Sequence, residues 1–141
     1  MEHTRNLNEW LRITLRLAEQ TADGKLALDI SFQNGGDEPH TLAFSNRSRK
    51  AELLGLRVFD EDMKPIAPAR RDIISLKDNK IEEHLIEPSA EWVHRLSGHV
   101  RAGFWEFQGA AYKIPRSYII KCHFEFEGVK SNALVINTTV E

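Results

Sequence analysis

Cysteine is almost absent from this sequence of 141 residues. Cys122 is the single one, so no disulfide can form within the chain, and a small scaffold held together by disulfides is excluded. No apolar run reaches the roughly 18 residues that a spanning helix needs, and the amino terminus lacks the apolar segment of a signal peptide. The sequence therefore predicts no membrane span and a cytoplasmic location. A location outside the cytoplasm would require a leader that had been removed upstream.

An excess of charge of either sign is also missing. Lys and Arg number 19 and Asp and Glu number 21, which gives a net charge of −2. This balance provides no overall attraction to nucleic acid or to an anionic membrane, so neither is predicted as a partner. Hydrophobic residues make up 41% and charged residues 28% of the chain, a composition typical of one folded globular domain.

The last third of the sequence carries its clearest pattern. Apolar and polar side chains alternate up to Phe126, and the polar side consists of Lys121, His123 and Glu125. A period of two is the signature of a strand with one buried face. The members of that face are Tyr118, Ile120, Cys122, Phe124 and Phe126. A turn at 127–130 and a second alternating segment at 132–140 follow, which indicates two consecutive strands.

Similar but shorter patterns predict further strands along the chain. They cover 11–17, 26–32, 41–44, 54–59, 73–76, 81–86 and 92–96. Residues 11–17 also fit one face of a helix, and this alternative stays open. About seven to nine short strands separated by Gly, Asn and Pro turns are typical of an antiparallel sandwich. We therefore predict an all-β fold with a single domain at 11–141, preceded by an extension at 1–10.

Several segments resemble bacterial immunoglobulin-like modules. They are the strand and Asn-Gly-Gly turn within 28–44, the strand and acidic turn within 56–66, and the Tyr112 to Tyr118 segment. The glycine that these modules place before the tyrosine is missing here. The resemblance covers about 11–140 and includes the intracellular proteinase-inhibitor modules of bacteria. It implies an immunoglobulin-like antiparallel β-sandwich, a Tyr118 that ties a corner loop to the sheet, and a non-catalytic protein-binding or accessory role in a bacterial protein.

Four aromatic residues gather in 97–112, a segment that reads as one long connection. They are Phe104, Trp105, Phe107 and Tyr112. Aromatic side chains in a loop beside glycines are typical of a surface that binds a protein partner. The alternative is that Phe104 and Phe107 cover the open end of the core. The first interpretation makes these four residues the candidate partner-binding site, with the identity of the partner unknown.

Motifs for catalysis or metal binding are sparse. His94 and His99 are the candidate pair for the alternative function, a small metal-binding or hydrolytic β-sandwich enzyme. However, there is no His-x-His, no His-Glu-x-x-His and no Gly-x-Ser-x-Gly. Cys122 lies on an apolar face and is expected to act as a small buried hydrophobe. The sequence therefore predicts no catalytic residue, no metal ligand and no cofactor.

Overall fold

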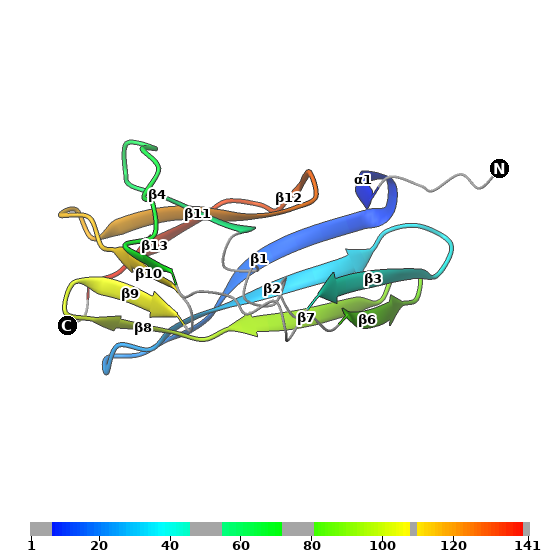
Figure 1. The fold of residues 1–141 in the computed structure, drawn as a ribbon, viewed down its shortest axis with the longest axis horizontal. Helices are drawn as coiled ribbons and strands as arrows, with labels where there is room; N and C mark the ends of the chain where they lie inside the picture. Colours follow the sequence, from blue (N-terminus) through cyan, green and yellow to red (C-terminus); the bar gives the residue numbers. More distant parts are fainter. Residues whose placement is uncertain (1–6, 46–54, 72–80, 108–109, 140–141) are drawn as a thin grey trace.

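The computed structural model of the chain describes residues 7–45, 55–71, 81–107 and 110–139. This part of the chain consists of antiparallel strands and one helical turn, α1 (Leu7–Trp10) (Figure 1). The prediction of an all-β fold is confirmed. The strand predicted at 73–76 lies outside the described residues.

The first sheet contains three strands, β1 (Leu11–Gln20), β2 (Leu26–Asn34) and β7 (Glu91–Leu96), with β2 in the middle. Residues 11–17 are therefore strand and not helix. Leu11, Ile13 and Leu15 are buried, because alternate side chains of a strand point to the same face. The Asp-Gly turn before β2 has Gly24 at a φ of 100°, a conformation that glycine adopts without strain.

The second sheet is built around β11 (Ile119–Phe126). Residues 121–124 of β11 pair with β4 (Leu56–Phe59), and residues 119–122 pair with β13 (Leu134–Asn137). Residues 125–126 pair with β12 (Val129–Lys130). Both residues of the Glu127-Gly128 turn have positive φ, as a tight hairpin turn requires. Inward side chains of β11 are buried, so the predicted alternation is confirmed from Ile120 to Phe124.

The two sheets share one hydrophobic core. Phe32 of β2 meets Phe124 of β11 edge to face, with ring centroids 5.9 Å apart. In Figure 1 the sheet of β11 lies above that of β1, β2 and β7. Complete burial of a large apolar side chain contributes about 1.5–3 kcal/mol, so this shared core stabilises the contact between the sheets.

A third sheet replaces the long connection predicted at 97–112, and that prediction is wrong. Strands β8 (Gly98–Arg101), β9 (Phe104–Phe107) and β10 (Ala110–Lys113) form a meander, which β5 (Arg70–Arg71) extends. Each meander strand has only four residues, too few for alternation to be recognised in the sequence. In addition, β10 buries three consecutive side chains and so breaks the period of two.

At the opposite end, β3 (His40–Ser45) pairs with β6 (Ile81–Ile86) (Figure 1). The fully buried Asn34 joins this pair to the first sheet. Its Nδ2 donates to the carbonyls of Glu38 and Ile86 at 2.7 and 2.9 Å. Trp10 is also buried and stacks on His40 at 4.4 Å between centroids. The core therefore reaches into the segment that was predicted to be an extension.

Side-chain amides connect the edges of the first two sheets. Asn132 bonds both main-chain groups of Leu15, accepting from its N–H at 2.8 Å and donating to its C=O at 3.0 Å. Further along, Gln20 donates from Nε2 to the carbonyl of Asn137 at 2.7 Å. The residue numbers of both partners increase from the first bridge to the second, so β1 and residues 132–137 run in the same direction. The amides take the place of a main-chain ladder along this seam.

Candidate functional site

The aromatic cluster of 97–112 lies mostly in the core. Trp105 has no exposed surface and donates from Nε1 to the carbonyl of Leu26 at 3.1 Å. Phe107 and Tyr112 are also buried, and only Phe104 is half-buried. This placement agrees with the core-covering alternative for Phe107. Burial leaves almost no surface on three of the four residues for a partner to contact.

The two candidate histidines lie in different sheets. His94 of β7 is half-buried and its ring lies 5.8 Å from that of Trp92. His99 of β8 is exposed and sits opposite Glu106 of β9. Within the described residues, no group of three or more His, Cys, Asp and Glu side chains is placed to hold a metal ion. The geometry therefore offers no support to the enzyme alternative.

The thiol of Cys122 is buried on the inner face of β11, as predicted. Burial disfavours the thiolate and raises the pKa of Cys122 to about 12. The thiolate is the nucleophilic form of cysteine, and it is almost unpopulated at neutral pH when the pKa is this high. Cys122 is therefore a buried core residue whose environment disfavours the reactive thiolate.

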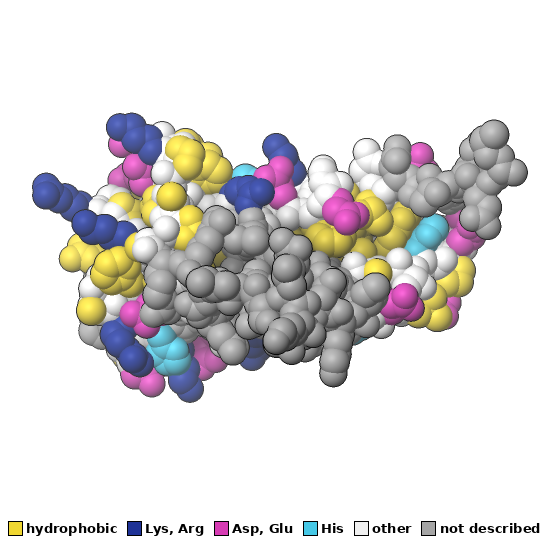
Figure 2. Space-filling view, viewed as in Figure 1, with side chains coloured by type: hydrophobic (Ala, Val, Ile, Leu, Met, Phe, Trp, Pro, Cys, Tyr) yellow, Lys and Arg dark blue, Asp and Glu magenta, His cyan; other side chains and the backbone are white. Residues whose placement is uncertain are grey.

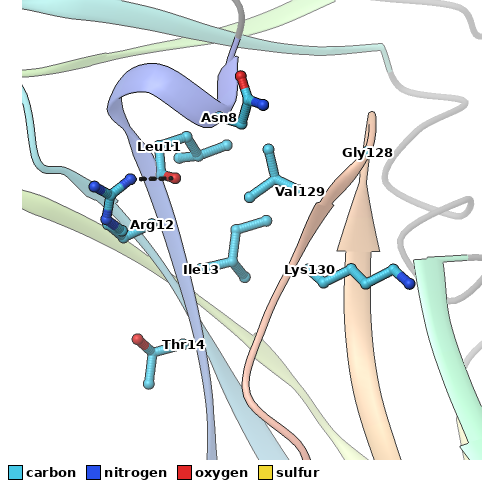
Figure 3. A pocket seen from close by; sticks show the side chains of 8 residues that line it. All are labelled: Asn8, Leu11, Arg12, Ile13, Thr14, Gly128, Val129 and Lys130. Atoms are coloured by element: carbon cyan, nitrogen blue, oxygen red, sulfur yellow. Dashed lines mark hydrogen bonds between the residues drawn. The ribbon is translucent and has the colours of Figure 1, made fainter.

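A cavity of about 340 Å³ lies between β1 and β12 (Figure 3). Its lining residues are Asn8, Leu11, Arg12, Ile13, Thr14, Gly128, Val129 and Lys130. Leu11, Ile13 and Val129 belong to the core and are almost fully buried. Arg12 and Lys130 point away from the cavity in Figure 3. Ionisable groups do not converge there, so the cavity lacks the arrangement typical of an active site.

The outward side of the second sheet is different, and we call it the outer face. Its side chains are Arg57, Phe59, Ile119, Lys121, His123, Glu125 and Val135. The strand register places Phe59, Lys121 and Val135 in one row across the three strands. Val135 is 68% exposed. Figure 2 shows hydrophobic side chains around β4 and β11, with charged ones beside them.

Tyr118 adds an aromatic ring at the start of β11, and it corrects a prediction. The sequence placed it on the buried side, but it is 53% exposed. The reason is its φ of 60°, which turns the chain just before the strand begins. Two hydrogen bonds from Thr138 to the main chain of Tyr118 hold this corner. The Tyr118 carbonyl accepts from the Thr138 N–H at 2.7 Å and from Thr138 Oγ1 at 2.9 Å.

Charged groups at one end of the outer face share a single carboxylate. Glu125 lies 3.2 Å from Arg57 Nε, 3.7 Å from Lys130 Nζ and 3.8 Å from His123 Nε2. The His123 ring also stacks on Phe59, with centroids 5.6 Å apart. In the described part of the chain, no carboxylate lies within ion-pair distance of Lys121. The face thus combines an apolar row, a cation within it and a polar border.

No protein-family model matches this chain, and no curated protein matches it significantly. Among the described residues, α1 is far too short to cross a membrane, and no other helix that could do so occurs.

The outer face was not predicted from the sequence. Alternation placed Lys121 on the polar side of its strand, but it gives no information about which residues of other strands lie beside it.

Proposed function

We propose that this chain is a non-catalytic protein-binding module with an immunoglobulin-like β-sandwich fold. The strand pairings support the fold assignment. Immunoglobulin sandwiches pair their first, second and fifth main strands in one sheet and their third, sixth and seventh in the other. Taking the meander and the β3–β6 pair as additions, β1, β2 and β7 match the first set. In the same way, β4, β11 and β13 match the second set.

The partner surface in this proposal is the outer face, and the row of Phe59, Lys121 and Val135 is the observation that carries it. Protein interfaces concentrate apolar side chains at their centre and place polar groups around them. Val135 is more than half exposed, while the ion pairs around Glu125 lie at the border. Burial of the exposed apolar groups by a partner would provide the favourable free energy.

A matched pair of substitutions tests this function. Val135 on the outer face and Leu85 on β6 are similarly exposed, at 68% and 63%. The immobilised wild-type protein, Val135→Glu and Leu85→Glu are each used to capture proteins from the native cell extract. The expected result is a partner that the wild type and Leu85→Glu retain and that Val135→Glu retains about tenfold less, equivalent to about 1.4 kcal/mol. Equal retention by Val135→Glu and the wild type would refute the outer face as the partner surface.

A further inference from the structure

Lys121 occupies an unusual environment on the outer face. Its neighbours across the sheet are Phe59 and Val135, and its neighbours two positions away along β11 are Ile119 and His123. Three of these four side chains are apolar. The stem of a lysine lies favourably along such groups while its ammonium stays at the surface. Lys121 therefore presents one positive charge from the middle of an apolar row.

Among the described residues, no carboxylate lies close enough to pair with this charge. Glu125 is the acidic residue of the outer face, and it lies four positions from Lys121, or about 13 Å along the strand. That separation exceeds the screening length of roughly 8 Å at physiological ionic strength. Glu125 is moreover shared by Arg57 and Lys130. Lys121 is therefore a positive charge of the outer face that no carboxylate among the described residues pairs with.

We propose that the outer face recognises an acidic segment of a partner protein, in which a carboxylate is flanked by apolar side chains. The carboxylate pairs with the Lys121 ammonium, and the flanking side chains pack on Phe59 and Val135. An ion pair bordered by apolar contacts is less exposed to water and salt than an isolated surface pair. This inference rests on the proposed function, because it assigns the kind of partner to the same face.

The test uses two short synthetic peptides that differ only in the sign of their charge. One alternates Glu with Val and the other alternates Lys with Val. Each is titrated into the full-length isotope-labelled protein while backbone amide signals are followed by NMR. The Glu-Val peptide is expected to shift the signals of Phe59, Lys121 and Val135, and the Lys-Val peptide is expected to leave them in place. An equal response to both peptides, no response to either, or shifts confined to another surface would overturn the inference.

Two variants of Lys121 separate charge from shape. Lys121→Met keeps an unbranched side chain of similar length and removes the charge, while Lys121→Glu reverses it. Binding of the Glu-Val peptide is expected to weaken about tenfold or more in Lys121→Glu and by less in Lys121→Met. Undiminished binding by Lys121→Glu would contradict the proposed ion pair. Signals that shift on simple dilution without peptide would instead identify a second copy of this chain as the occupant.

The outcomes also distinguish this inference from the proposed function. Loss of partner capture in Val135→Glu, combined with no response to the Glu-Val peptide, leaves the binding module in place and rejects the acidic segment. Unchanged capture by Val135→Glu rejects the outer face as the partner surface, whatever the peptides do.

Discussion

The β8–β10 meander and the outer face of the second sheet distribute apolar side chains in opposite ways. The meander concentrates aromatic residues within a few positions of sequence and buries Trp105, Phe107 and Tyr112. The outer face collects Phe59, Ile119 and Val135 from three separate strands and leaves Val135 68% exposed. Aromatic density along the chain therefore marks core in this protein, while the apolar surface arises only when strands far apart in sequence are placed side by side.

Truncation in the meander is expected to have the largest effect on stability. Trp105→Ala removes a fully buried indole and its hydrogen bond to the Leu26 carbonyl. The loss should be about 3–5 kcal/mol, as for other large aromatic truncations in cores. Unfolding in urea monitored by circular dichroism measures it. A loss below about 1 kcal/mol would contradict the assignment of Trp105 to the core.

A smaller effect is expected where the meander begins. A Cβ added at Gly98 would lie 2.6 Å from Trp105 Nε1 and 2.7 Å from the Leu26 carbonyl oxygen. Gly98→Ala should therefore push the indole away from its acceptor and destabilise the fold by about 1–3 kcal/mol, as overpacking does. The same urea titration measures the effect. Gly103→Ala is not a suitable control, because Gly103 has a φ of 84°.

The inner side of β11 provides the next comparison, since Cys122 lies directly beside Lys121. Cys122→Ala should destabilise the fold by about 1 kcal/mol, a typical value for a small loss of core volume. The wild-type protein should also lose stability relative to Cys122→Ala as pH rises from 9 towards 12. Burial in the folded state raises the pKa of the Cys122 thiol from its ordinary value of 9.0 to about 12, so the unfolded state releases its proton first. If the free energies of unfolding of the two proteins changed with pH in parallel, the thiol would be accessible to solvent in the folded state.

The smallest effect is expected on the outer face itself. Val135→Glu should change the free energy of unfolding by less than about 0.5 kcal/mol, because Val135 is largely exposed and contributes little to the core. The new carboxylate would also face Lys121 across the strand pair. Thermal unfolding checks this expectation. A strongly lowered melting temperature would mean that Val135 is a structural residue and that its loss of binding reflects misfolding.

The alternation of apolar and polar residues predicted most of the main strands but not which strands pair with each other. It located β1, β2, β7 and β11 because their inward residues reach the core in a regular period of two. The strands of the meander were not predicted, because a strand of four residues holds only two repeats of that pattern. Tyr118 was placed on the wrong side because a positive φ in a residue other than glycine has no signature in composition. The row through Lys121 depends on register between distant strands, which a single sequence does not encode locally.

The seam between β1 and residues 132–137 has a mechanical consequence. The two segments run in the same direction, so opposite forces applied to the two ends of the chain would slide them lengthwise past each other. The Asn132–Leu15 and Gln20–Asn137 bridges would then bear the load together, in shear, before either sheet was peeled apart. Hydrogen bonds loaded together resist more force than bonds broken one at a time. This seam therefore resists opposite pulls on the two ends of the domain in shear.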